Sequence, residues 1–379
     1  MRNYKEKSFL GLELLRFLCS LSVLIWHYQH FFKISALATI DGYDVSLQPL
    51  YSLLWIWYEL GGYAVQIFWA LSGFIFFWKY AELIRDGGLG GREFFTLRFS
   101  RLYPLHFLTL VFVALLQWGY WDVHGGPYIY LSNDVRHFAL NLFMASHWGF
   151  QKNYSFNGPI WSVSIEVLAY AAFFLIARRV AFTPRNMLAL IVTLTIFLMA
   201  LPGMQDIMLC LLFFFAGGCV HVLVSRTSIP LFRTLEVSSL CFAALLGINI
   251  LTHGKVQAYM QVFLAVSLLS AFLLVGQGIR GERWRALCTG LGNLTYSSYL
   301  LHFPLQLAVV LVLDHWGVGR EVFYQPYCLG LFVVAAFALS HLSFTLIEHP
   351  AQSWLRRRYM AAALDSKRVN ESATPRQRI

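Results

Sequence analysis

The sequence predicts an all-α protein that crosses a membrane about ten times. Of its 379 residues, 58% are hydrophobic and 13% are charged, and the mean hydropathy is +0.59. Soluble domains carry about 25% charged residues, so most of this surface does not face water. The apolar residues form continuous runs of about 20, the length that an α-helix needs to cross a bilayer. A transmembrane β-barrel would instead show alternating segments of about ten residues.

Ten stretches of the chain have the length and composition of membrane spans. We expect them at residues 8–32, 60–80, 102–121, 161–177, 187–202, 207–224, 235–252, 258–277, 291–313 and 327–348. The segment 135–148 is too short to cross a bilayer. We expect it to lie at the membrane interface or to dip into it.

The basic residues indicate the orientation of these spans. With the N-terminus in the cytoplasm, 23 of the 29 lysines and arginines fall on cytoplasmic segments, five fall on outer loops, and Arg16 alone lies inside a span. This asymmetry follows the positive-inside rule and predicts that both termini are cytoplasmic. It also explains the net charge of +10 without a nucleic-acid partner.

We expect one integral-membrane domain over 1–355 and a basic, polar, disordered tail over 356–379. No small-residue cleavage site follows the first apolar run, which predicts that this run is retained as a span. The six cysteines contain no CxxC pair, and most lie in apolar runs. We therefore expect neither a disulfide framework nor a metal site. No internal repeat of the kind seen in transporters is evident.

The first span, which contains "RFLCSLSVLIWH", carries Arg16 and His27. Eleven residues correspond to three helical turns plus about 20°, so both side chains share one helix face and stand about 16 Å apart along the axis. An ionisable residue within a span costs at least a few kcal/mol and is a candidate for function. The alternative is a structural role, in which each side chain bonds to a neighbouring helix.

Three further spans carry ionisable residues. Glu166 lies in "GPIWSVSIEVLAY", with Ser162 four residues before it on the same face. His302 lies in "LGNLTYSSYLLHFPL", where Tyr299 shares its face and a proline interrupts the helix directly afterwards. Glu348, in "IEHP", falls near the inner end of the last span. For each of these residues a structural pairing within the membrane is the alternative to a functional role.

Two arginines at the inner surface, Arg98 and Arg101 in "RFSRLYP", are i, i+3 neighbours. Guanidinium groups suit a polyphosphate ligand, although ordinary positive-inside charge explains them as well. The glycines of "GGYAVQIFWALSGFIFFW" favour close helix packing over a phosphate cradle. The sequence contains no GxGxxG, P-loop, HExxH or GxSxG motif.

Six of these segments, in this order, resemble the membrane-bound acyltransferase family 3, whose members O-acylate extracytoplasmic carbohydrates. They are the arginine and histidine of the first span, then "GGYAVQIFWALSGFIFFW", "RFSRLYP", "GPIWSVSIEVLAY", "LGNLTYSSYLLHFPL" and "IEHP". The resemblance covers residues 9 to 350. It implies a stand-alone member without the esterase-like C-terminal domain, of the type that acetylates exopolysaccharide, O-antigen or lipo-oligosaccharide in the bacterial cytoplasmic (inner) membrane.

The resemblance also implies roles for single residues. His27 is expected to be catalytic with Arg16 as its companion, and Glu166 is expected to hold the imidazole tautomer or to orient the acceptor. The phosphates of acyl-CoA, most simply acetyl-CoA, are expected at the arginine pair near residue 100. The supporting or substrate-contacting residues would be Ser162, Tyr299, His302 and Glu348. Acyl-CoA would be a co-substrate, with no permanently bound cofactor and no metal.

The chemistry leaves two routes open. His27 would act as a general base on a sugar hydroxyl, or it would carry the acyl group outward as a transient acyl-histidine. A proton-coupled transporter or a flippase of a glycan intermediate is the alternative function, because intramembrane Arg, His and Glu are also typical of proton relays. A structural membrane subunit is a weaker alternative. The ordered motifs and the inner arginine pair favour the enzyme.

Overall fold

The structure, a computed structural model, describes residues 9–35 and 37–359, and its regular elements are helices with one isolated β-bridge between Lys33 and Thr39. The α-helices are α1 (Leu10–His27), α2 (Tyr51–Leu60), α3 (Ala64–Arg85), α4 (Gly91–His124), α5 (Val135–Leu142), α6 (Ile160–Ala177), α7 (Pro184–Ala200), α8 (Gln205–Arg226), α9 (Leu231–Leu251), α10 (Gln257–Gly278), α11 (Glu282–Asn293), α12 (Thr295–His315) and α13 (Pro326–Ser343). The prediction of an all-helical fold is confirmed.

Nine helical segments of the described chain are long and apolar enough to cross a membrane. The one expected span that is not among these nine, 187–202, corresponds to α7, whose 17 residues are at the lower limit for crossing. Ten crossings, counting α7, would place both ends of the described chain on the same side of the membrane, and their cytoplasmic location stays a prediction. The segment around α5 is not a span, since its helix has 8 residues.

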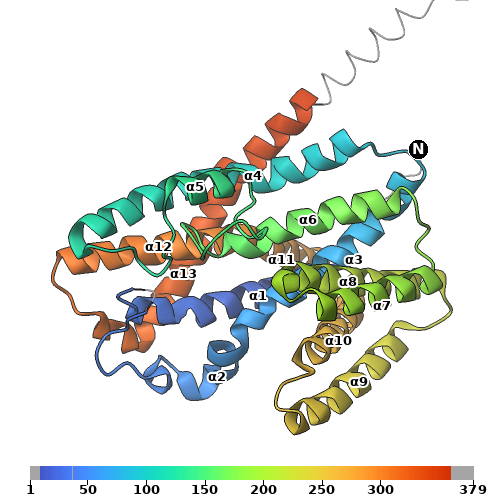
Figure 1. Ribbon diagram of the computed structural model, residues 1–379, viewed down its shortest axis with the longest axis horizontal. Helices are drawn as coiled ribbons and strands as arrows, with labels where there is room; N and C mark the ends of the chain where they lie inside the picture. The colour runs from blue at the N-terminus through green and yellow to red at the C-terminus, as the bar shows by residue number, and fades with distance from the viewer. Residues whose placement is uncertain (1–8, 36, 360–379) are drawn as a thin grey trace, which may run out of the picture.

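Helix α1 lies in the middle of the bundle, with α4 and α5 along one edge and α9 and α10 along the opposite edge (Figure 1). It packs against α3, α10, α11 and α12. Helix α9 packs mainly on α10 and leaves most of its residues exposed, as expected of a helix that faces lipid. The central position of α1 keeps its polar stripe away from lipid.

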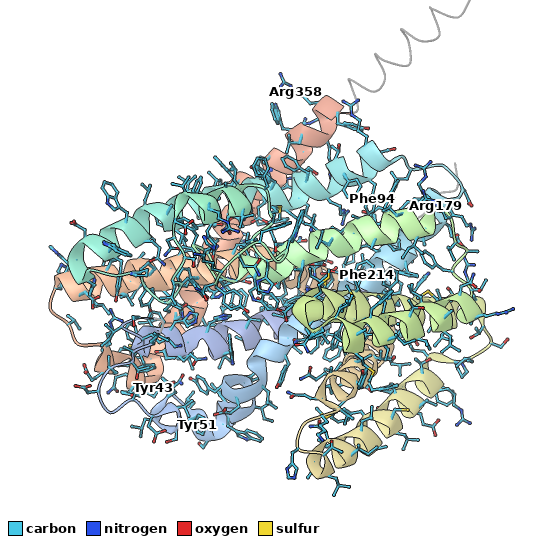
Figure 2. All side chains as sticks on the ribbon, in the orientation of Figure 1. Tyr43, Tyr51, Phe94, Arg179, Phe214 and Arg358 are labelled. Carbon is cyan, nitrogen blue, oxygen red and sulfur yellow. The ribbon has the colours of Figure 1, made fainter. Side chains whose placement is uncertain are left out.

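The outer loops and the inner basic residues lie at opposite ends of the molecule. Figure 2 shows Tyr43 of the loop after α1 at one end and Arg179, at the end of α6, at the other. Between these ends, Phe94 and Phe214 belong to an aromatic cluster built by α3, α4, α6 and α8. A second cluster, near the outer end, includes Phe31 stacked on Phe323 at 4.0 Å between ring centroids.

Three differences from the predicted boundaries involve residues near the site. Helix α4 begins at Gly91, eleven residues before the expected span, so the arginines near residue 100 lie on a helix and not in a loop. The outer part of the first span, Tyr28–Phe32, is a 3₁₀ helix. The last helix passes through a π-helical turn at Phe344–Glu348 and runs to residue 359, so the first four residues of the expected tail are helical. The remaining tail lies outside the described residues.

Helices α3 and α8 approach closely through two glycines. A Cβ atom at Gly73 would stand 1.7 Å from the carbonyl oxygen of Phe214, and one at Gly217 would stand 1.8 Å from that of Ala70. Both contacts are to backbone, so no side-chain rotation can relieve them. This is the small-residue packing that lets membrane helices approach each other.

We predict that Gly217→Ala separates α3 from α8 and lowers the stability in detergent by about 1–3 kcal/mol, the usual effect of overpacking. The apparent melting temperature of the purified variant measures the effect. Gly119→Ala on α4 is the matched control, because no described atom beyond its own helix lies within 4 Å of the added Cβ. Equal melting temperatures for the two variants would contradict the close approach.

Candidate active site

Residues 9–35 and 37–359 enclose two adjacent cavities beside α1, of which Arg16 reaches one and His27 the other. The inner cavity, of about 120 Å³, is lined by residues that include Arg16, Ser72, Arg98, Arg101, Glu166 and Thr295. The outer cavity, of about 380 Å³, is lined by residues that include Trp26, His27, His30, Lys33, Tyr130 and Trp161. Val65 and Tyr299 line both cavities. The polar stripe of α1 therefore faces these adjacent cavities, with Arg16 on the inner one and His27 on the outer one.

The inner cavity is positively charged. Three guanidinium groups line it, from Arg16, Arg98 and Arg101, and within the described chain Glu166 is the one carboxylate among the lining residues. Glu166 is 9% exposed, and its Oε1 atom has no hydrogen-bond partner among residues 9–35 and 37–359. The excess of positive charge suits an anionic ligand.

Packing and hydrogen bonds hold two of these guanidinium groups in place. Arg98 lies over the rings of Phe76 and Tyr80, each at 4.9 Å from the ring centroid, and donates a hydrogen bond to the Tyr80 hydroxyl. Arg16 donates to Glu13 at 2.9 Å and to the Thr295 hydroxyl at 3.0 Å. Arg101 is exposed.

Arg356, on the last helix, adds positive charge near the inner cavity. Its Nε donates to the Ser100 hydroxyl at 3.4 Å, and its charge acts on both Arg98 and Arg101. The sequence prediction assigned this residue to the tail. Residues 356–358 form a run of three arginines shortly after the last expected span, and this run was the sequence feature that could have indicated a basic group near the cavity.

His27 is oriented by its own helix. Its Nδ1 lies 3.0 Å from the carbonyl oxygen of Val23, one turn earlier. A carbonyl only accepts, so Nδ1 carries the hydrogen and Nε2 carries the lone pair. Val23, and not Glu166, therefore fixes the tautomer, since Glu166 lies in the inner cavity. The expected role of Glu166 in holding the imidazole is corrected accordingly.

Gln306 of α12 links His27 to His30. Its Nε2 donates to the backbone carbonyl of His27 at 2.8 Å, which turns its Oε1 toward Nδ1 of His30 at 3.2 Å. By the same reasoning, His30 donates through Nδ1 and has its lone pair on Nε2. The ring centroids of the two histidines are 4.8 Å apart. Sequence reasoning missed both His30 and Gln306.

His302 completes a cluster of three imidazoles. Its ring centroid is 4.6 Å from that of His27, and its Nδ1 lies 3.2 Å from the carbonyl oxygen of Ser298. The side chain is fully buried, and its Nε2 has no partner within the described part of the chain. The structure thus brings His302 to His27, as a shared site requires. No group of three or more His, Cys, Asp or Glu side chains in the described ranges is arranged to hold a metal ion.

Tyr299 stands where the two cavities meet. Its hydroxyl donates to the carbonyl oxygen of Pro159 at 2.8 Å and lies 2.7 Å from the hydroxyl of Ser162. These contacts tie α12 to the start of α6. Because the ring of Tyr299 lines both cavities, it forms part of the wall between them.

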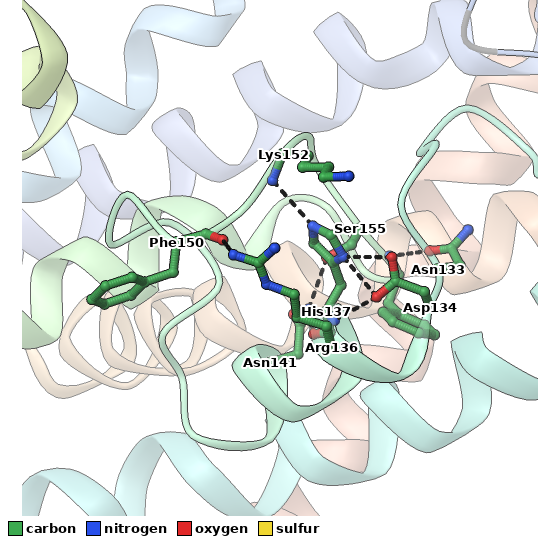
Figure 3. Close-up of polar contacts among 9 residues, drawn as sticks. Asn133, Asp134, Arg136, His137, Asn141, Phe150, Lys152 and Ser155 are labelled. Atoms are coloured by element: carbon green, nitrogen blue, oxygen red, sulfur yellow. Dashed lines mark hydrogen bonds and ion pairs between the residues drawn. The ribbon is translucent and has the colours of Figure 1, made fainter.

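The loop over the outer cavity is held by the polar network in Figure 3. Asp134 caps α5 by accepting the His137 backbone N–H at 2.9 Å, and its carboxylate also lies 2.8 Å from Nδ1 of that imidazole. These hydrogen bonds hold the pKa of Asp134 below its usual value. The other ring nitrogen of His137 accepts the Lys152 backbone N–H at 3.1 Å, and Arg136 donates to the Phe150 carbonyl. The network fixes a loop that supplies Tyr130, among other residues, to the cavity wall.

Glu348 lies apart from the residues that line the two cavities. Its carboxylate accepts hydrogen bonds from the hydroxyls of Ser297 and Ser343, which connects the π-helical turn to α12. Its contacts support the helix that carries Tyr299 and His302, and they leave it no direct contact with either cavity in the described structure.

Comparison with known proteins gives a consistent result. A model of the acyltransferase domain family matches residues 9–345. The acyltransferase MdmB of Streptomyces mycarofaciens is 26% identical over 348 residues, which cover 81% of this chain and 85% of that protein. No solved structure matches.

Proposed function

The chain belongs to the acyltransferase 3 family of multi-pass membrane proteins, and from this premise we propose that it transfers an acyl group from cytoplasmic acyl-CoA to a hydroxyl of an extracytoplasmic carbohydrate. The family establishes acyl transfer. We propose four further points: acyl-CoA as the donor, a carbohydrate as the acceptor, acetyl as the simplest acyl group, and the bacterial cytoplasmic membrane as the location. One observation carries the proposal: a cation-lined inner cavity meets an imidazole-lined outer cavity at Tyr299.

The inner cavity fits the donor. The phosphates of acyl-CoA would meet Arg98 and Arg101, because planar guanidinium groups bind phosphate oxygens through paired hydrogen bonds. Arg356 adds charge at the same place. The nucleotide would remain at the inner mouth, where Arg101 is exposed, and the pantetheine arm would enter the cavity.

The arm would run along α1 past Arg16 toward His27. These two residues are about 16 Å apart along the helix axis, so a long flexible arm is needed to join a phosphate site at one end to a reactive group at the other. Tyr299 stands on this path. Its hydrogen bonds to Pro159 and Ser162 would break as the thioester passes into the outer cavity.

His27 would act as the general base. Its Nε2 lone pair removes the proton from the acceptor hydroxyl, the oxygen attacks the thioester carbonyl, the C–S bond breaks, and the CoA thiolate takes that proton from the His27 imidazolium. An imidazole is suited to this task near neutral pH. His302, with its unpartnered Nε2 close by, would help to disperse the proton that His27 acquires.

The geometry is also compatible with a transient acyl-histidine, because the nitrogen that accepts a proton is also the nucleophilic one. The two routes differ in whether the protein carries the acyl group. Labelled acyl-CoA mixed with the enzyme without acceptor, and quenched within one turnover, leaves label on the protein only in the acyl-histidine route.

We predict that His27→Ala lowers the rate of acyl transfer by about 10²–10⁴-fold, the range that a positioned acid–base group contributes. Release of CoA by the purified enzyme with an acceptor glycan measures the rate, and membrane abundance confirms insertion. His315→Ala is the control, because this histidine is exposed at the end of α12. Wild-type turnover in His27→Ala would remove the proposed role.

We predict that Arg101→Ala raises the KM for acyl-CoA by about tenfold or more and leaves the KM for the acceptor nearly unchanged, because one hydrogen-bonded charge contact contributes about 1.5–3 kcal/mol. Arg101 suits the test better than Arg98, whose side chain is packed between aromatic rings.

Arg179→Ala, which removes an exposed arginine after α6, is the matched control for Arg101→Ala. It keeps the overall loss of inner charge equal while sparing the cavity. An equal rise in the donor KM for both variants would show that general surface charge, and not a phosphate contact at position 101, is responsible.

A further inference from the structure

We propose that the outer cavity selects an acceptor that carries an anionic group, a carboxylate or a phosphate, which binds Lys33. This inference rests on the proposed function and specifies its substrate class. The cavity volume of about 380 Å³ lies within the usual range for small-molecule sites, in which a few polar groups on an apolar wall set the specificity.

Lys33 carries the permanent charge of this cavity. Among the described residues that line it, no Asp, Glu or Arg is present, and the remaining polar side chains are histidines, tyrosines, tryptophans and Asn153. The Lys33 ammonium makes no ion pair or hydrogen bond with any side chain that the structure describes, although it acts electrostatically on His27 and His30. An anionic group on the ligand would give this unpaired ammonium a charge-assisted hydrogen-bond partner.

The neighbouring cation makes a useful contrast. Arg320 also lies at the outer end of the bundle, but its guanidinium is paired with Asp314 at 2.7 Å. It donates another hydrogen bond to the backbone carbonyl of Lys33. The backbone of Lys33 is thus held by Arg320 and by the bridge to Thr39, while its ammonium has no ion pair among the described residues.

Aromatic rings make up much of the remaining wall and suit a sugar. Trp26, Tyr130, Tyr154 and Trp161 line the cavity, and the apolar C–H face of a pyranose packs well on such rings. Trp161 is supported by His147, whose ring centroid is 5.2 Å away. Gly158 brings the backbone against Tyr130, since a Cβ there would stand 2.2 Å from a ring atom. These contacts fix the orientation of the wall.

Lys33 and His27 occupy the two ends of one short segment. The residues between them form a 3₁₀ helix, whose rise over six residues is about 12 Å. An acceptor whose anion binds Lys33 would therefore place a hydroxyl of the same or the adjoining sugar at His27. The anion would position the reacting group, and a neutral glycan would lack this contact.

Binding of a matched set of glycosides to the purified protein in detergent tests the inference. The probes are methyl β-D-glucoside, methyl β-D-glucuronide and methyl β-D-glucoside 6-phosphate, which differ in the group at C6, and the fluorescence of the cavity tryptophans reports binding. We expect at least one anionic probe to bind about tenfold more tightly than the glucoside, and the preference to fall with added salt because charges are screened. Whichever of the two anionic probes binds more tightly shows whether the site prefers a carboxylate or a phosphate.

Lys33→Gln should abolish the preference, and Lys33→Arg should retain it. Lys255→Gln is the control, because this lysine is exposed on another outer loop and should leave the preference intact. Equal binding or no binding of all three probes, or a preference that survives in Lys33→Gln, overturns the inference.

The binding assay contains no acyl-CoA, so its outcome is separate from the test of acyl transfer. If the anionic probes bind through Lys33 but the enzyme acylates no glycan, the proposed function fails while the anion site remains. If the enzyme acylates the neutral and anionic probes with equal efficiency and Lys33→Gln changes neither reaction, acyl transfer stands and the proposed selectivity is lost.

Discussion

The need to keep Arg16 and His27 out of lipid shapes the rest of the structure. A charged or polar side chain in the hydrocarbon core costs several kcal/mol unless it faces protein or water. Both residues lie on one face of α1, so this helix must be enclosed, and α3, α10, α11 and α12 enclose it. On the face that they cover, Arg16 and His27 line cavities, and Ser20 between them is packed against Ser298 of α12 at 2.6 Å. Two adjacent cavities remain because the polar stripe is buried while part of the space beside it stays unfilled.

The fold, and the position of Arg16 and His27 on one helix face, could be predicted because they depend on local regularities. Apolar runs and the distribution of basic residues gave the spans, and the eleven-residue spacing of Arg16 and His27 placed them on one helix face. His302 and His27 both lie in segments that carry the family resemblance, and their ring centroids are 4.6 Å apart. The start of α4 was placed too late, because its first two turns are polar enough to leave the membrane while remaining helical.

The remaining parts of the site depend on contacts that the sequence does not encode locally. His30 and Lys33 lie on the 3₁₀ segment and directly after it, where helix periodicity gives no direction for a side chain. Gln306 acts through the backbone of a distant helix. The family resemblance suggested that Glu166 contacts His27. Its position along α6 instead places its side chain in the inner cavity. Only the packing of α1, α6 and α12 decides which polar groups share a cavity.

The central claim is that a donor bound at the cytoplasmic mouth reaches, through the bundle, an imidazole near the opposite leaflet. An electron cryo-microscopy structure with a non-hydrolysable thioether analogue of acetyl-CoA tests it most directly. The account predicts density for the phosphates at Arg98 and Arg101, and for the sulfur beyond Tyr299, beside His27. Phosphates bound at the outer cavity, or an analogue that ends in the inner cavity with His27 turned toward lipid, would contradict it.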